Sequence, residues 1–546
     1  MSIASHFLAR LYDLPKRTGR ARRPETEMVK MPDGISLSTE IHRPRKSGDY
    51  PTLLMRVPYG TKGFATVAEA YAERGFNVVL QACRGTGSSE GEFDPLTNER
   101  ADGLATLAWL KAQPFYDGRL GTTGPSYLGY AQWAICDALP KGAAMATKVS
   151  SSEFRSVVFP GGAFHLGLWL GWLQTVEGLR KNPATIARRM FSGGIERRTQ
   201  KASMTLPLID ADKRVVGREV GFWRRWMTEA IGNDAFWEDL DHTHRLGPRT
   251  PPNHFISGWY DFMVDQLLRD YETLTYSGHT PYLTIGNWYH VSNALQGASI
   301  RETLTWMRAH LLGEREGLRE RPVRLEISGM NEWRDFDAYP PGPADDQIWH
   351  IHPDKVLSRR PVRASEPDRY RYDPRRPTPN LGGAIFAFTG AGPVDQKTLE
   401  ARADVLVYTS EPLNVPLTVI GNVRVTLYAR ASIPNADFFV KLCDVSPDGI
   451  STNICDGFIR MTSAAPAVPD DIWRLQFKLH ATAHCFKRDH SLRLQISSGA
   501  HPRYARNTGT DEPAGTTTTL VPSFMEIFHD PTRPTAISLP VYDLRE

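Results

Sequence analysis

The chain has 546 residues, of which 41% are hydrophobic and 23% charged, and its formal net charge is +4. This composition is that of an ordinary globular protein and excludes a disordered, collagen-like or coiled-coil chain. So small a charge over so many residues also argues against a nucleic-acid-binding surface. At roughly 150 residues per domain, the length predicts about three to four structural units.

The five cysteines are odd in number and widely spaced, and they form no CxxC or zinc-ligand pattern. They indicate neither a disulfide framework nor a metal site, so we expect a cytoplasmic protein without a metal. Residues 1–27 form a basic leader that we expect to be mobile. Its cationic residues follow the apolar ones, whereas those of a signal peptide precede them, so we do not interpret this leader as a signal peptide. No stretch of the sequence is long and apolar enough to span a bilayer, and we expect no membrane partner.

Short β-rich runs alternate with helical patterns from residue 28 to about residue 146, which is typical of an α/β sheet. Residues 52–57 and 76–81 are predicted to be buried strands. Between them, residues 65–74 have helical spacing and end at Gly75, a helix-terminating residue.

The next part of the chain predicts an insert in this domain. From residue 147 to 245 the strand signals thin out and tryptophan, leucine and arginine become frequent, which indicates a helical insert. Strand patterns return over 246–318, so we expect 28–146 and 246–318 to form one α/β domain. Over 319–546, short β-rich runs between Pro, Gly, Asn and Asp turns predict an all-β sandwich or jelly roll.

Two serines lie in surroundings like those of a nucleophile elbow. Ser89 belongs to a literal GxSxG match, but the residues after it do not begin a helix, so we interpret it as part of a glycine-rich loop. Ser126 lies in GPSYLG, between a short predicted strand and a predicted helix, as an elbow requires. From these residues alone, a serine in a glycine turn is as good an interpretation as a nucleophile.

A catalytic serine needs a base and an orienting carboxylate, which follow it along the chain in this kind of fold. Asp261 follows the predicted strand 255–257, and His290 follows the predicted strand 283–285. Both therefore lie where ligand sites of α/β sheets gather. Alone, Asp261 is equally well a helix N-cap and His290 a surface histidine, but all three residues in this order predict a triad.

Several motifs at matching spacing give the chain, from residue 28 onward, a resemblance to the cocaine esterase and X-prolyl dipeptidyl peptidase family of serine hydrolases. They are RVPY at 56–59, QACRGTGSSEGEF at 81–93, GPSYLG at 124–129, GWYD at 258–261, GNWYH at 286–290 and GMNEWR at 329–334. The resemblance implies an α/β-hydrolase domain, a helical cap inserted in it and a C-terminal, galactose-binding-like jelly roll packed against both. The chain departs from the family's QDxRG motif, where it has QACRG.

The resemblance also implies roles for individual residues. Ser126 would be the nucleophile, His290 the general base and then acid, and Asp261 the carboxylate that orients the imidazole. The oxyanion hole would consist of the backbone N–H of Tyr127 and the phenol of Tyr59. No cofactor is implied.

The substrate pocket is harder to predict. Aromatic residues of the insert and of one strand end are candidates for it, although such spacing is more often typical of helix packing. These candidates are Phe164, Trp169, Trp172 and Trp259.

We expect hydrolysis of a carboxylic ester, or an amide, of a small and partly aromatic acyl substrate through an acyl-enzyme. The main alternative is an X-prolyl dipeptidyl peptidase acting on short peptides, which would need a carboxylate such as Glu153, Glu177 or Glu219 to hold the free amine. A non-catalytic carbohydrate-binding protein is a remote alternative, and a homo-oligomer is left open.

Overall fold

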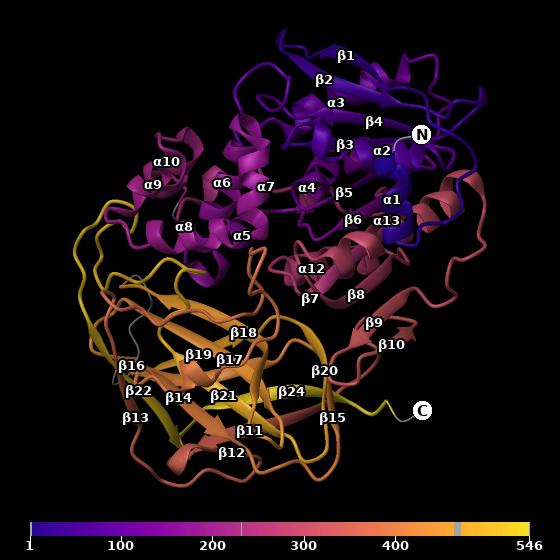
Figure 1. Ribbon diagram of the computed structural model, residues 1–546. Coiled ribbons are helices and arrows are strands. Elements are labelled where there is room, and N and C mark those ends of the chain that lie inside the picture. The colour runs from indigo at the N-terminus through magenta and orange to yellow at the C-terminus, as the bar shows by residue number, and fades with distance from the viewer. Residues whose placement is uncertain (1–2, 231, 464–470, 545–546) are drawn as a thin grey trace.

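A long mixed sheet forms the first half of the fold (Figure 1). The computed structural model describes residues 3–230, 232–463 and 471–544. The strands lie in the order β1-β2-β4-β3-β5-β6-β7-β8-β9-β10, parallel from β4 to β9 and antiparallel at both edges. Their bounds are β1 Glu25–Lys30, β2 Ser36–His42, β3 Thr52–Val57, β4 Asn77–Ala82, β5 Leu120–Pro125, β6 Ala144–Lys148, β7 Asn253–Tyr260, β8 Tyr282–Tyr289, β9 Val323–Ile327 and β10 Glu332–Phe336.

Helices cover both faces of this sheet because its inner strands are buried on both sides. One face packs against α2 (Ala65–Ala72) and α13 (Asn293–Met307), and the other against α3 (Glu99–Lys111) and α12 (Val264–Tyr276). The helix α4 (Tyr127–Trp133) directly follows β5.

The N-terminal segment differs from the expected mobile leader. Residues 3–11 form the helix α1 (Ile3–Leu11), which packs against α2. Buried Ser5 donates a hydrogen bond to Glu73 at 2.5 Å, and buried Leu14 packs into the cluster under α2 and α13. Leu8, Ala9 and Tyr12 also pack against this cluster, whereas Ile3, Phe7 and Leu11 are exposed.

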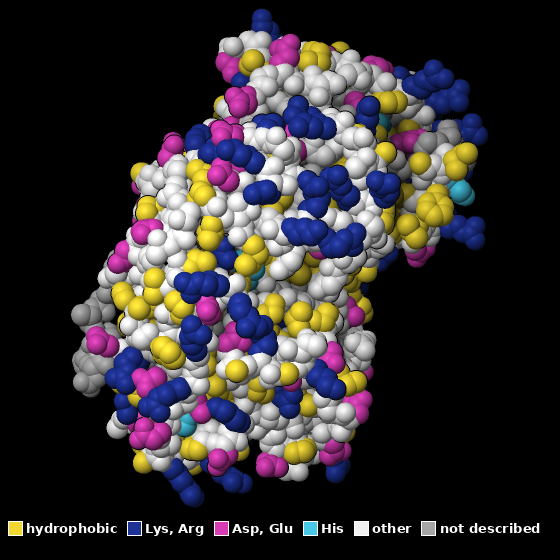
Figure 2. All heavy atoms as spheres, turned by 60° about the vertical axis from the view of Figure 1, so that its left-hand side comes forward, with side chains coloured by type: hydrophobic (Ala, Val, Ile, Leu, Met, Phe, Trp, Pro, Cys, Tyr) yellow, Lys and Arg dark blue, Asp and Glu magenta, His cyan; other side chains and the backbone are white. Residues whose placement is uncertain are grey.

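The helical insert lies between β6 and β7 and forms a cap beside the sheet (Figure 1). Its helices are α5 Arg155–Val158, α6 Leu166–Lys181, α7 Pro183–Phe191, α8 Gly194–Ala202, α9 Ala211–Val216, α10 Gly221–Thr228 and α11 Asp234–Glu238. Arg188, Arg197 and Arg198 of the cap are exposed, and Arg189 is half-buried. Figure 2, which turns the cap side forward, shows basic side chains gathered across the upper half of the view.

The C-terminal half forms a second unit built of strands (Figure 1). These are β11 Asp345–His352, β12 Val356–Ser358, β13 Asp368–Tyr372, β14 Val405–Thr409, β15 Leu417–Gly421, β16 Arg424–Ala431, β17 Ala436–Val445, β18 Ser451–Met461, β19 Trp473–Lys478, β20 Thr482–Phe486, β21 Ser491–Ser497, β22 Ser523–Asp530, β23 Arg533–Pro534 and β24 Ala536–Tyr542. Their inward side chains share one apolar core. This is the jelly roll that the sequence predicts.

One domain boundary differs from the sequence expectation. β9 and β10 lie beyond residue 318, yet they continue the first sheet to Phe336. They do so because β9 pairs in parallel with β8 and buries Val323, Leu325 and Ile327 against the first domain. None of the helices in the described part of the chain is long and apolar enough to cross a membrane.

Candidate active site

A sharp turn between β5 and α4 presents Ser126. Its φ of 58° and ψ of −123° are strained for a non-glycine residue and cost about 1–3 kcal/mol. Its N–H donates to the Lys148 carbonyl at 2.8 Å, which ties the turn to β6. The flanking glycines make the close crossing possible, because a Cβ at Gly124 or Gly129 would lie 2.4 Å from a neighbouring side chain.

The three residues predicted as a triad meet at the carboxyl ends of β5, β7 and β8. The distance from His290 Nε2 to Ser126 Oγ is 3.1 Å, and the distance from His290 Nδ1 to Asp261 Oδ2 is 2.5 Å. Asp261 is completely buried, and its Oδ1 accepts a hydrogen bond from the Met263 N–H at 2.8 Å. One carboxylate oxygen thus fixes the loop while the other faces the imidazole.

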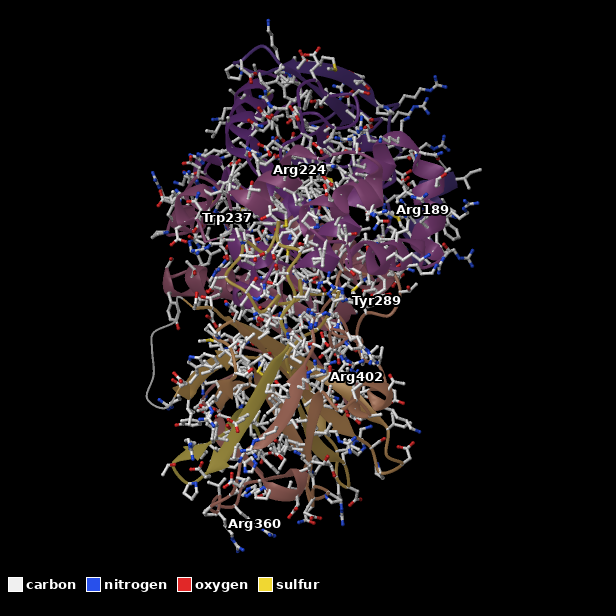
Figure 3. The ribbon with its side chains drawn as sticks, turned by 90° about the vertical axis from the view of Figure 1, so that its left-hand side faces the viewer. Arg189, Arg224, Trp237, Tyr289, Arg360 and Arg402 are labelled. Atoms are coloured by element: carbon white, nitrogen blue, oxygen red, sulfur yellow. The ribbon has the colours of Figure 1, made fainter. Side chains whose placement is uncertain are left out.

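Aromatic rings shield this histidine. The Phe262 ring lies 4.4 Å from the His290 ring at an interplanar angle of 30°, and the Phe386 ring meets the His290 ring edge-on at 6.0 Å. Phe386 belongs to the C-terminal domain, so both domains shape the site. Figure 3 shows Tyr289, the residue before this histidine, at the level where the two domains meet. The sequence analysis identified neither ring as part of the site. Phe262 could have been identified because it directly follows Asp261, whereas no feature of the sequence points to Phe386.

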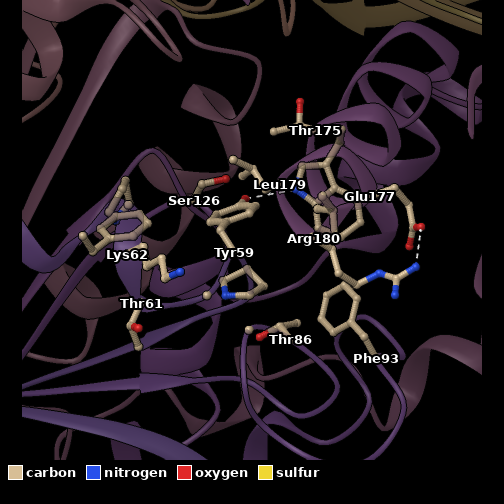
Figure 4. Close-up of a pocket in the computed structure, with 18 of the residues that line it drawn as sticks. Tyr59, Thr61, Lys62, Thr86, Phe93, Ser126, Thr175, Glu177, Leu179 and Arg180 are labelled. Atoms are coloured by element: carbon tan, nitrogen blue, oxygen red, sulfur yellow. Dashed lines mark hydrogen bonds and ion pairs between the residues drawn. The ribbon is translucent and has the colours of Figure 1, made fainter. Parts of the chain in front are cut away.

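Two hydrogen-bond donors flank Ser126. Tyr127 is the first residue of α4, so its N–H has no acceptor within the helix. The Tyr59 hydroxyl faces Ser126 and accepts a hydrogen bond from Trp172 Nε1 at 3.0 Å (Figure 4). Burial raises the pKa of Tyr59 to about 12, which keeps its proton in place at neutral pH. Because the Trp172 N–H occupies one lone pair of this oxygen, it helps to orient the phenolic proton away from Trp172.

These groups open onto a cavity of about 1760 Å³. The cap contributes Trp172 and Phe222 to its lining, the first domain Tyr59 and Phe93, and the C-terminal domain Phe386. The lining is therefore aromatic around Ser126, as binding of an apolar or aromatic group requires.

Three of the four predicted pocket aromatics do not line this cavity. Phe164 meets the Trp223 ring edge-on at 5.4 Å, and Trp169 meets the Trp226 ring at 4.6 Å, so both belong to the core of the cap. Trp259 lies in the core under α12, where its Nε1 donates to the Glu326 carbonyl at 2.8 Å. Helical spacing did not distinguish these core faces from the face toward the cavity.

Of the three glutamates considered as amine ligands, Glu177 lines the cavity. Its carboxylate accepts hydrogen bonds from Arg180 at 3.1 Å and Arg218 at 2.8 Å (Figure 4 draws the first). Glu153 instead pairs with Arg269 at 2.8 Å, and Glu219 is exposed and pairs with Lys213. The one glutamate of the three that reaches the cavity is thus already neutralised.

The alternative serine is occupied elsewhere. The Ser89 hydroxyl donates to the Ala82 carbonyl at 2.8 Å and accepts from the Ser38 N–H at 2.9 Å. Both interactions hold it in the loop after β4, where no helix begins.

Comparisons with known proteins match both halves of the chain. Residues 33–292 match the model of the X-Pro dipeptidyl-peptidase (S15) family, and residues 317–538 match the X-Pro dipeptidyl-peptidase C-terminal non-catalytic domain. Cocaine esterase of Rhodococcus sp. (strain MB1 Bresler) is 31% identical over 88% of this chain and 92% of its own. A putative serine esterase of Mycobacterium bovis is 24% identical over 89% and 92%.

Solved structures share the fold over almost the whole length. An aminopeptidase from the marine sediment archaeon Thaumarchaeota archaeon has a TM-score of 0.81 at 23% identity, covering 97% of this chain and 98% of its own. An alpha-amino acid ester hydrolase has the same TM-score and coverage at 20% identity.

Proposed function

Because the chain belongs to the cocaine esterase and X-Pro dipeptidyl-peptidase (S15) family, a family of hydrolases that act on esters or amides, we propose that it cleaves carboxylic esters through an acyl-enzyme on Ser126. The observation that carries this proposal is the continuous chain from Ser126 through His290 to Asp261, with distances of 3.1 and 2.5 Å. A histidine held in this way can accept the serine proton.

In the proposed reaction, His290 Nε2 takes the proton from Ser126 Oγ as the oxygen attacks the ester carbonyl. The tetrahedral oxyanion accepts hydrogen bonds from the Tyr59 hydroxyl and the Tyr127 N–H. Asp261 stabilises the imidazolium, which then gives its proton to the leaving alcohol. Water, activated by His290, attacks the acyl-enzyme and releases the acid.

The oxyanion role of Tyr59 gives a direct test. We expect Tyr59→Phe to lower kcat about 10²- to 10³-fold, since it removes one donor to the oxyanion and leaves the ring in place. The measurement is steady-state hydrolysis of a 4-nitrophenyl ester. Tyr260→Phe is the matched control, because it deletes another buried hydroxyl, which donates to the Asn453 carbonyl at 3.4 Å outside the triad. Equal activity of the two variants would contradict the role.

The charge around Glu177 favours an esterase over a dipeptidyl peptidase. A free amine of a peptide substrate would have to compete with Arg180 and Arg218 for this carboxylate. Six cationic and three acidic side chains line the cavity, which adds further repulsion for an ammonium group.

A substrate panel separates the two activities. We expect turnover of 4-nitrophenyl acetate and benzoate, and no detectable turnover of Xaa-Pro 4-nitroanilides, because Asp94 and Glu177 are already paired with arginines and Glu92, the third acidic residue of the lining, is exposed to solvent. Turnover of the anilides alone would replace the esterase with the peptidase. Turnover of neither class would favour the non-catalytic alternative.

Location in the cytoplasm stays a prediction, consistent with the free thiols of all five cysteines.

A further inference from the structure

Part of the cavity lining comes from β3, β6, α2 and α13 rather than from the cap, and we call this part of the cavity the second lobe. It extends from Ser126 and His290 between α2 and α13, where no residue has a part in the proposed reaction. Its lining residues include Met55, Val67, Tyr71, Lys148, Leu295, Ser299 and Ile300. Of these residues, Tyr71, Lys148 and Ser299 carry polar side-chain groups, and the others are apolar.

Lys148 is the unusual residue of this lobe. It is the last residue of β6, it lines the cavity and it is only 3% exposed. Ala144 and Ala146 belong to the cluster under α13, and strand alternation puts Lys148 on the same face. Its carbonyl accepts the Ser126 N–H, so its side chain begins directly beside the nucleophile.

Among the residues that the structure describes, the ammonium group has neither a carboxylate nor a hydrogen-bond partner. Burial, with no opposing charge, lowers the pKa of Lys148 to about 7. The hydroxyl of Ser299, buried on α13, likewise makes no hydrogen bond within the described chain. Because β6 and α13 pack against each other, the Lys148 and Ser299 side chains line the same lobe.

The charged and titratable groups around Lys148 do not neutralise it. Tyr71 on α2 and His254 on β7 face this side of the sheet, and burial raises the pKa of Tyr71 while burial and nearby cations lower the pKa of His254 well below its usual value. Both are therefore uncharged at neutral pH. The catalytic His290 lies at the lobe's opening, and α13 contributes no acidic side chain to the lining.

A buried cation without a partner is costly to the fold, and such groups normally pair with an anion. We infer that the Lys148 ammonium and the Ser299 hydroxyl bind a carboxylate carried by the substrate. The preferred substrates are then esters that keep one free carboxylate, such as monoesters of dicarboxylic acids. This inference rests on the proposed esterase activity and names the substrate class for that site.

The test compares esters that differ only in the free carboxylate. In one pair, the mono-4-nitrophenyl ester of adipic acid is compared with 4-nitrophenyl hexanoate, and in the other 4-carboxyphenyl hexanoate with phenyl hexanoate. We expect the wild type to have the higher kcat/KM for the acid in one of the two pairs. In that pair Lys148→Met should lower the acid-to-neutral ratio about tenfold or more, as expected on losing a hydrogen bond between two charged groups.

Lys62→Met is the matched control, because Lys62 lines the same cavity but is exposed. Its removal should change the ratio by less than about threefold, since solvent screens the charge. The wild-type ratio should also fall as the pH rises above about 7, when empty Lys148 loses its proton, and it should be flat in Lys148→Met. Both esters need His290 as the base, so a change in its protonation alters kcat/KM of the acid and the neutral ester alike and leaves their ratio unchanged.

A folding measurement keeps the result interpretable. At pH 6 the ammonium is charged in the folded and the unfolded chain, but only the folded chain buries it. Lys148→Met should therefore have a higher melting temperature than the wild type. Equal acid-to-neutral ratios for the wild type and Lys148→Met in both pairs would overturn the inference. Unchanged hydrolysis of the neutral esters by Ser126→Ala would instead overturn the proposed function.

Discussion

Replacing Ser126 with alanine is expected to lower kcat for 4-nitrophenyl esters about 10⁴- to 10⁶-fold. The physical reason is that the alanine leaves the oxyanion donors and the cavity intact but removes the oxygen that forms the acyl-enzyme. His290 would then have no hydroxyl proton to accept at 3.1 Å. Alanine at position 126 carries about the same backbone strain as serine, so the free energy of unfolding should change by less than about 1 kcal/mol.

Ser89→Ala is the matched control for this variant. It removes the serine of the literal GxSxG motif, whose hydroxyl is bonded to the Ala82 carbonyl, and it should keep its activity within about threefold. If Ser89→Ala lost activity while Ser126→Ala kept it, the elbow after β5 would not hold the nucleophile.

Asp261→Asn should lower kcat about 10⁴-fold, or about 5.5 kcal/mol in activation free energy. The buried carboxylate accepts the Nδ1 proton at 2.5 Å and so leaves Nε2 free to accept from Ser126. An asparagine amide can donate to Nδ1 instead, which puts the ring proton on Nε2 and prevents it from acting as a base. The measurement is the pH profile of kcat for a 4-nitrophenyl ester.

Asp270→Asn controls for loss of a buried charge. Asp270 is also buried, and accepts hydrogen bonds from the Ser152 N–H at 2.8 Å and hydroxyl at 2.7 Å. Burial raises its pKa to about 6, so neutralising it costs the fold little near neutral pH. Its activity should stay within about tenfold of the wild type. Adding Asp261→Asn to Ser126→Ala should cause no further loss, because the three residues act as a unit.

The sequence was enough to predict that these three residues would come together, because the positions of parallel strands are encoded locally. Ser126, Asp261 and His290 each follow a predicted strand, and the carboxyl ends of parallel strands meet at one edge of the sheet. The glycines beside Ser126 were a second local signal, since the turn needs them for close approach. The fold class was predictable for the same reason, with a helical insert and an all-β second half visible in the residue patterns.

The pocket was not predictable in this way because it depends on which side of a helix faces the cavity. Trp169 and Trp172 are neighbours on α6, yet one packs in the core of the cap while the other reaches Tyr59. Both are buried, so hydrophobicity cannot separate them. Phe386 reaches the site from the other domain, and no local pattern records such a contact.

Lys148 was missed because a single lysine at the end of an apolar strand looks like a residue that turns toward solvent. Its burial depends on α13, which lies more than a hundred residues later in the chain. The contact of Leu14 with the cluster under α2 and α13 was also missed, since it lies in a segment with many basic residues. In each case the deciding contact is long-range.

The central claim is that catalysis passes through a covalent intermediate on Ser126, and active-site labelling followed by peptide mass spectrometry tests it most directly. A fluorophosphonate should add once to the wild type, on the peptide that contains Ser126, with loss of ester hydrolysis in proportion to labelling. Ser126→Ala should not be labelled. Labelling of a different serine in the active wild type, or full inactivation without a label on Ser126, would contradict the account.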